Sequence, residues 1–267
     1  MSICRYFHRA PRRSENSHES RTSTKGYRGG TRKGLDLTIS GSTSSPYFAF
    51  QDATTRGGIL LRSLRTKNAQ VVSGPSLLVD HILSLSEASS IQELVEQKWG
   101  SDISAFREAD NSMFLRPVAA PPANSVTVHR SPRIGLELSH PGTTATMSHP
   151  RVAFVARPYR FFTHPELLTS NGRAQTFLGL LNAQLDAGES LSSETMKKHL
   201  AMTCGLKEKT LSSYLSDYVS GLDKGVLEMF VGPSGKGVSS SASRYLRMMG
   251  ARERESERQK NDVVKCT

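Results

Sequence analysis

Few side chains in this sequence stand at a spacing that would bind a metal ion or form a disulfide framework. The three cysteines, Cys4, Cys204 and Cys266, lie far apart, without a Cys-X-X-Cys pair and without a histidine at ligand spacing. A reducing compartment is therefore expected. Neither a metal nor any other cofactor is predicted from these residues.

Carboxylates and histidines could carry acid–base chemistry instead, but they do not cluster along the chain. Glu15 and Glu19 stand in a polar segment and lack the apolar neighbours that general acids and bases commonly have. His129, His140 and His149 have no mutual spacing for a metal ion, and we expect them to be solvated. Composition alone assigns no catalytic residue.

Arg62 is a charged residue in an apolar setting. It follows Gly58-Ile59-Leu60-Leu61, whose consecutive apolar positions are typical of a strand buried on both faces. A charge at the end of such a run either lies in a functional site or marks where the strand leaves the core. The pattern leaves both interpretations open.

The elements that would position these residues are short strands and two helices in the first part of the chain. Pro75 follows Ser73-Gly74 at a helix start, and apolar residues at helical spacing predict helices over 75–85 and 91–98. Alternating or continuous apolar runs predict strands over 36–39, 47–51, 58–64, 113–116, 126–129, 133–136, 152–156 and 159–162.

The chain becomes helical after Pro165. Three apolar stripes, over 177–185, 196–203 and 211–219, predict three amphipathic helices, with Gly205 and Gly221 placed as C-caps. Segment 200–215 also has the pattern of a helix-turn-helix. In that geometry the second helix would expose four candidate contacts to nucleic-acid backbone, Lys207, Lys209, Ser212 and Ser213.

The excess of basic residues lies at the two ends. The chain of 267 residues has a formal net charge of +11, yet residues 34–243 contain 19 basic and 18 acidic residues. The total charge is therefore weak support for nucleic-acid binding by the body. No apolar run is long enough to span a membrane, so a membrane partner is not expected.

The composition predicts four regions along the chain. Residues 1–33 are rich in Arg and Ser, which fits both a mitochondrial presequence and a loop of the fold. Residues 34–168 are expected to form an α+β domain. Residues 169–231 are expected to form a helical extension, and residues 232–267 a flexible basic tail.

Four segments occur in an order that resembles the alkyladenine (methylpurine) DNA glycosylase family. They are Gly58-Ile59-Leu60-Leu61-Arg62-Ser63-Leu64, Val72-Ser73-Gly74-Pro75-Ser76-Leu77-Leu78, Ser131-Pro132-Arg133-Ile134-Gly135-Leu136 and Ala156-Arg157-Pro158-Tyr159-Arg160-Phe161-Phe162. The resemblance covers about residues 47–165. It implies an α+β fold, a single mixed antiparallel-sheet domain of the methylpurine DNA glycosylase type, to which the C-terminal helical region is appended.

The resemblance also implies a chemistry and a base pocket. Enzymes of this family flip a damaged purine out of duplex DNA, stack it on aromatic rings and hydrolyse its N-glycosidic bond with water activated by a glutamate. The residues that it places in the pocket are Tyr6, His18, Gln51, Arg62, Ile134 and Gly135, with Tyr47 and Phe48 as stacking candidates. The position of the glutamate falls on Cys4, and a thiol acts as a general base only with a strongly lowered pKa. The catalytic residue is therefore unknown at this stage.

Two hypotheses follow. In the first, the chain is a monomeric DNA glycosylase of base excision repair that acts on double-stranded DNA. In the second, it is an inactive relative that binds nucleic acid, RNA included, as a subunit of an organellar ribonucleoprotein. A mitochondrial or nuclear location is expected, and the basic N-terminal segment favours the mitochondrial one.

Overall fold

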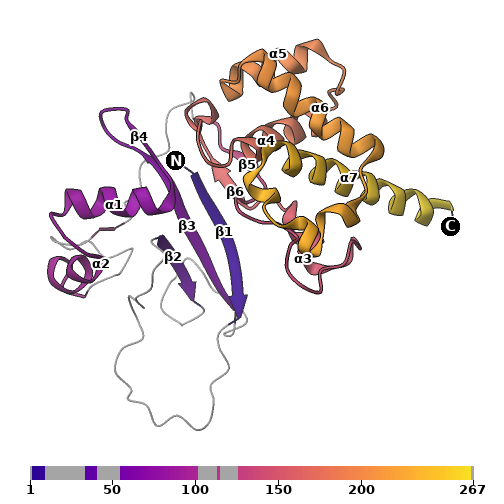
Figure 1. Cartoon of the computed structure of the whole chain (residues 1–267). Coiled ribbons are helices and arrows are strands. Elements are labelled where there is room, and N and C mark those ends of the chain that lie inside the picture. The colour runs from indigo at the N-terminus through magenta and orange to yellow at the C-terminus, as the bar shows by residue number, and fades with distance from the viewer. Residues whose placement is uncertain (1, 10–33, 41–54, 102–112, 115–125, 266–267) are drawn as a thin grey trace, which may run out of the picture. The chain divides into compact units, whose positions relative to one another are not determined.

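The chain is an α+β protein that divides into two compact units, Met1–Val126 and Thr127–Thr267. The computed structural model describes residues 2–9, 34–40, 55–101, 113–114 and 126–265, which Figure 1 shows as coloured ribbon. Each unit is described by itself below. None of the described helices combines the length and the apolar composition that crossing a bilayer requires.

The first unit is built on antiparallel strands. Its elements are β1 (Ser2–Arg9), β2 (Leu35–Ser40), β3 (Thr55–Arg65), β4 (Val71–Ser73), α1 (Pro75–Leu85), α2 (Ile91–Glu93) and a π-helical turn, Leu94–Lys98. The long strand β3 pairs with β1 on one edge and with β2 on the other, and β4 folds back onto its C-terminal end. Since β1 pairs with β3, residues 2–9 belong to the fold, whereas 10–33 lie outside the described residues.

One face of this sheet is covered by helix α1. Val79 and Leu83 of α1 form a small core with Leu94, and Leu35 of β2 packs against that core. Because side chains alternate between the two faces of a strand, the residues on either side of Leu35 lie on the opposite face. The first unit therefore has one apolar, helix-covered face and a second face of different composition.

The second unit is mainly helical. Its elements are β5 (His129–Ser131), α3 (Pro150–Val155), β6 (Arg160–Phe162), α4 (Arg173–Asp186), α5 (Glu194–Cys204), α6 (Glu208–Lys224) and α7 (Ala242–Lys265), with 3-10 turns at Pro165–Leu167, Leu227–Phe230, Gly232–Gly235 and Val238–Ser240. The two short strands β5 and β6 pair antiparallel.

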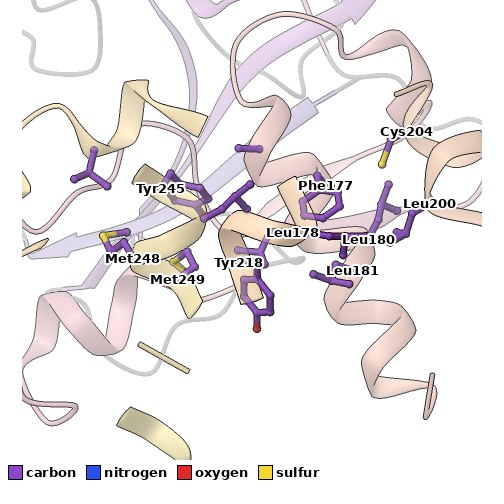
Figure 2. Packing of buried hydrophobic residues seen from close by; sticks show 14 of the residues in the cluster. Phe177, Leu178, Leu180, Leu181, Leu200, Cys204, Tyr218, Tyr245, Met248 and Met249 are labelled. Atoms are coloured by element: carbon purple, nitrogen blue, oxygen red, sulfur yellow. The ribbon is translucent and has the colours of Figure 1, made fainter. Parts of the chain in front are cut away.

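Helix α4 lies at the centre of the second unit's core. Its residues 174–181 are all buried, and α5, α6 and α7 contribute the remaining large side chains. Figure 2 shows Leu180 of α4 near Leu200 of α5, with Tyr245, Met248 and Met249 of α7 closing the other side. Burial of this many large apolar groups supplies the main stabilising free energy of the unit.

Helices α6 and α7 cross unusually closely, and glycines make the crossing possible. A Cβ atom on Gly221 would overlap the carbonyl oxygen of Arg247, and one on Gly250 would overlap that of Tyr218. The sequence prediction that Gly221 ends a helix is therefore wrong, because α6 continues through it to Lys224. Gly205 does end α5, in the left-handed conformation with a φ of 60°.

Four further expectations differ from the structure. Segment 152–156, expected as a strand, belongs mostly to helix α3, because Pro150 suits a first helical turn and the His149 side chain accepts a hydrogen bond from the backbone N–H of Arg151. Segment 133–136 is a turn rather than a strand. The expected strand over 126–129 is confined to His129–Ser131, and Met113 and Phe114 are not in a strand.

The expected flexible tail is an integral part of the second unit. Residues 242–265 form α7, whose Tyr245, Leu246 and Met248 are almost fully buried. The Gly- and Ser-rich run before it folds into tight turns, because glycine and serine allow compact backbone as well as flexible linkers. The expected domain boundary after residue 168 lies inside the second unit, which begins at Thr127.

The helix crossing predicts an unusual effect of alanine. In an ordinary helix interior a glycine-to-alanine exchange stabilises by about 1 kcal/mol, but in Gly221→Ala the new methyl group would overlap the Arg247 carbonyl. We expect this variant to lose about 1–3 kcal/mol of unfolding free energy, measured by urea titration with far-UV circular dichroism.

Ser213→Ala is the matched control, because Ser213 lies exposed on the same helix, and a change within about 0.5 kcal/mol is expected. Fluorescence of Trp99, the single tryptophan, reports on the first unit and should be unaffected. A Gly221→Ala protein as stable as the unmodified chain would contradict the close crossing.

Candidate functional site

The first two segments of the family resemblance lie together in the first unit. Strand β3 contains Arg62, and β4 with its Ser73-Gly74-Pro75 turn pairs back onto it through Ser63 and Ser73. The backbone N–H of Gly74 donates a hydrogen bond of 2.8 Å to the carbonyl oxygen of Arg62. Gly74 has a φ of 129°, which a residue with a side chain rarely adopts, so glycine is required at this turn.

Strand alternation places Arg62 on the sheet face opposite helix α1. Leu35, which packs under α1, pairs with Leu61 across the β2–β3 ladder. Arg62 is the next residue along β3 and therefore lies on the other face, together with Leu60 and Asp36. Arg62 is half-buried and Asp36 is exposed.

Strand β1 places Tyr6 and Cys4 beside residues of β3. In the β1–β3 ladder Tyr6 pairs with Gly58, and Cys4 pairs with Leu60. On the other side of β3, Asp36 also pairs with Leu60. Cys4 of β1 and Asp36 of β2 are therefore paired with the same residue, Leu60, from opposite sides of β3.

The other two segments of the resemblance lie together in the second unit. Ser131 pairs with Arg160 in the β5–β6 ladder. The Arg160 guanidinium is almost completely buried, lies 4.6 Å from the centre of the Phe162 ring, and donates hydrogen bonds to Ser131 Oγ at 3.2 Å and Thr176 Oγ1 at 2.8 Å. This interior cation ties both strands to helix α4 and fixes where the chain leaves β5.

Ile134 and Gly135 follow β5 at a turn. The Ile134 side chain packs so closely on Gly172, at the start of α4, that a Cβ atom on Gly172 would overlap it. Gly135 is exposed, has a φ of 84°, and a Cβ there would meet nothing within 4 Å. The turn therefore has an anchored side chain and, beside it, accessible backbone.

A carboxylate holds this turn in place. Glu137 Oε1 accepts a hydrogen bond from Ser139 Oγ at 2.7 Å, and Oε2 accepts bonds from the Gly237 N–H at 3.1 Å and from Ser239 Oγ at 3.0 Å. Partial burial opposes ionisation of Glu137, but these hydrogen bonds outweigh it and lower its pKa below the ordinary value of 4.5. The Gly- and Ser-rich loop thus acts as an internal carboxylate clamp.

The helix-turn-helix expectation agrees with the local structure of α5 and α6. Gly205 ends α5, and the N–H of Leu206 bonds to the carbonyl oxygen of Ala201, which completes a tight turn before α6. Leu206, Leu211 and Leu215 are buried. All four candidate backbone contacts, Lys207, Lys209, Ser212 and Ser213, are exposed, and the exposed Glu208 stands among them.

His129 and Cys204 both have structural explanations. His129, expected to be solvated, stacks on Phe162 with ring centres 5.6 Å apart, and burial lowers its pKa. Burial raises the pKa of Cys204 to about 12, so this thiol is not a nucleophile. Within the ranges that the structure describes, no three His, Cys, Asp or Glu side chains gather in a way that could hold a metal ion.

Several predicted site residues cannot be placed. His18, Tyr47, Phe48 and Gln51 lie outside the described residues, and for Tyr6 the structure gives the register but not the side chain. The sequence interpretation also missed Asp36 and Glu137. The alternation of Leu35, Asp36 and Leu37 does indicate that Asp36 lies on the sheet face opposite the two leucines. No pattern near Glu137 in the sequence indicates that it binds a loop about one hundred residues further along the chain.

Comparison with known proteins adds one relative. About half of the chain is similar to a protein of Acanthamoeba polyphaga mimivirus named Uncharacterized protein L759, with 31% identity over 134 residues. The match covers 49% of this chain and 54% of the viral protein, so the chain spans about half the length of the curated relative it matches. No protein-family model and no solved structure matches the chain.

The Glu137 clamp gives a stability prediction with a defined pH dependence. Glu137→Gln removes the charge that four donor groups of Ser139, Gly237 and Ser239 stabilise, so we expect a loss of about 1–2 kcal/mol of unfolding free energy at pH 7. Because the folded-state pKa is lowered, this contribution is present above the ordinary value of 4.5 and is lost as the pH falls through the lowered value.

Urea titrations of both proteins between pH 7 and pH 3 test this. The two curves should converge on acidification, and a constant gap would show that the carboxylate charge has no role. Glu189→Gln serves as control, since Glu189 is exposed at the loop before α5, and we expect it to change stability by less than about 0.5 kcal/mol.

Proposed function

We propose that this chain is a methylpurine DNA glycosylase-like enzyme of base excision repair. Its substrate would be duplex DNA with an alkylated or deaminated purine, which is flipped from the stack before the N-glycosidic bond is hydrolysed. The observation that supports this most is the pairwise assembly of the four resembling segments: β3 with the Ser-Gly-Pro turn in one unit, and the 131–136 segment with β6 in the other.

The described residues suit separate steps of such a reaction. Arg62 supplies a cation on the sheet face opposite α1, where the phosphate or sugar of a flipped nucleotide would lie. Within the second unit, Gly135 offers backbone without a side chain and Ile134 is fixed against Gly172 beside it; both remain proposed pocket residues by resemblance. Tyr6, His18, Gln51, Tyr47 and Phe48 remain proposed pocket and stacking residues by resemblance.

Arg62 gives the direct test of this proposal. We expect the full chain to release hypoxanthine from a duplex oligonucleotide under single-turnover conditions. Arg62→Ala should reduce the rate about 100-fold, because one oriented charge beside the reacting nucleotide is lost. Product release is measured by strand cleavage at the resulting abasic site.

Arg65→Ala is the matched control, since Arg65 ends the same strand and is exposed. It should excise at the rate of the unmodified chain. The hydrolytic function would be overturned if the unmodified protein released neither hypoxanthine nor 7-methylguanine above a no-protein blank.

A second candidate function is nucleic-acid binding without turnover, as a subunit of an organellar ribonucleoprotein in mitochondria. Two observations favour it. The family's glutamate position falls on Cys4, and the α5–α6 hairpin exposes Lys207 and Lys209 on its second helix. In this reading the hairpin, rather than the sheet face, would contact the phosphates of DNA or RNA.

Salt dependence tests the hairpin. A protein that neutralises phosphates with lysines loses affinity linearly on a logarithmic salt scale, with a slope of about 0.9 per contact on duplex DNA. The double variant Lys207→Gln/Lys209→Gln should therefore flatten the slope by about 1.8 in fluorescence-anisotropy titrations. The double variant Lys236→Gln/Lys260→Gln, which removes exposed lysines elsewhere in the unit, should leave it unchanged. Equal slopes in all three proteins would exclude the hairpin as the contact.

A further inference from the structure

The proposed hydrolysis needs a carboxylate, and the structure has one on the sheet face opposite α1. N-glycosidic hydrolysis develops positive charge on the sugar and requires a base for the attacking water, and carboxylates serve both needs. Among the described strands of both units, Asp36 is the single acidic residue. It is exposed, and thus accessible to water and to a ligand.

The position of Asp36 relative to Arg62 follows from the ladder. Asp36 pairs with Leu60 across β2 and β3, and Arg62 is two residues further along β3 on the same face. Diagonal neighbours of this kind are about 7–8 Å apart, which is close enough for both side chains to contact one ligand. The face thereby presents an anion across from Leu60 and a cation two residues further along β3.

The other carboxylates of the described first unit belong to its helical segment, where Asp80 lies within α1 and Glu87 follows that helix. Glu93 and Glu96 belong to the helical segment next to α1, where Glu93 accepts hydrogen bonds from Ser89 and Glu96 from Gln92. Leu94 of that segment packs with Val79 and Leu83 against the covered side of the sheet. Among the described residues of the first unit, Asp36 is therefore the acid that lies beside Arg62 in the strand ladder.

We propose that Asp36 is the general base of the N-glycosidic hydrolysis, an assignment that rests on the proposed glycosylase function. The sugar of the flipped nucleotide would lie over Leu60, with its phosphate towards Arg62. The carboxylate of Asp36 takes a proton from a water molecule as the water oxygen bonds to C1′. The base would then come from β2 rather than from the Cys4 position of β1.

For a cationic lesion the reaction needs no general acid, because the departing base does not have to be protonated. In 7-methylguanine the purine ring carries a positive charge. When the C1′–N9 bond breaks, its electron pair passes to the ring, and the base leaves as a neutral molecule. The water proton ends on Asp36, and the hydroxyl ends on C1′. Cationic N-alkylated purines are accordingly the substrate class that suits a site with this single carboxylate.

The experiment uses the full chain and duplex DNA that contains one 7-methylguanine. Single-turnover release of the base is measured for the unmodified chain and for Asp36→Asn, Asp36→Glu and Asp36→Ala, with spontaneous depurination subtracted. We expect Asp36→Asn and Asp36→Ala to release base at least 100-fold more slowly. Asp36→Glu, which keeps the charge, should be at least 10-fold faster than Asp36→Asn. Glu87→Gln, an exposed acid after α1, should match the unmodified chain.

Chemical rescue separates a chemical from a structural role. Added formate should restore release by Asp36→Ala, because a small carboxylate can occupy the vacated position, whereas chloride at equal ionic strength should not. Circular dichroism and Trp99 fluorescence check that each variant is folded, and Asp36→Glu still decides the question if Asp36→Ala is not.

The outcomes distinguish the two levels of the proposal. If the unmodified chain releases base and Asp36→Asn releases it equally fast, the assignment of Asp36 is overturned while the glycosylase function stands. The assignment is also overturned if Asp36→Glu is as slow as Asp36→Asn and formate has no effect. If the unmodified chain releases neither 7-methylguanine nor hypoxanthine, the proposed function fails and the role of Asp36 fails with it.

Discussion

The packing of α1 against one side of the β2–β3 ladder is the interaction on which the candidate site depends. Once Leu35 is fixed under Val79 and Leu83, the two-residue period of the strands leaves no freedom for their neighbours. Asp36 and Arg62 must then lie on the other face. A slip of β2 by one residue would place Asp36 under the helix, where burial of a charge without a partner would cost several kcal/mol.

In the second unit, close backbone approach has a corresponding role. Gly221 and Gly250 allow α6 and α7 to cross almost in backbone contact, and this brings the large side chains of α7 into the core. The last helix therefore completes the fold around α4. The same principle operates where Gly179 lets α4 lie directly against the backbone of β5 at Arg130. Small residues at these points determine the position of the 131–136 segment.

Local patterns predicted the elements whose formation is decided locally. The apolar run before Arg62 is part of β3, the helix over 75–85 agrees with α1, and the Gly205 cap is confirmed. The errors arose where distant contacts decide. Segment 152–156 is apolar enough for a strand, and only its cap and packing make it helical. Gly221 resembles a cap in sequence, yet it serves a crossing with a helix that composition suggested was a tail.

For the site, the sequence predicted types of residue better than their partners. Arg62 stood out because a charge after buried leucines is unusual, and the structure adds its neighbours. Asp36 was overlooked because a single acid in a weakly alternating stretch has no distinguishing local feature. Its interest arises only from the pairing of β2 with β3, which joins residues more than twenty positions apart. Register of this kind depends on the whole sheet and cannot be obtained from a short pattern.

The arginines of the second unit explain why a basic composition need not mean a basic binding surface. Arg173 donates to the carbonyl oxygen of Gly205, Arg252 to that of Val152 and Arg254 to that of Gly225. Arg247 pairs with the nearly buried Asp217 at 2.8 Å. The first three guanidinium groups satisfy backbone carbonyls at helix ends and turns. Arginine suits this role because its planar guanidinium has several N–H donors. Their charge contributes to the high pI without being directed at a ligand. Net charge is therefore a poor guide to whether such a chain binds nucleic acid.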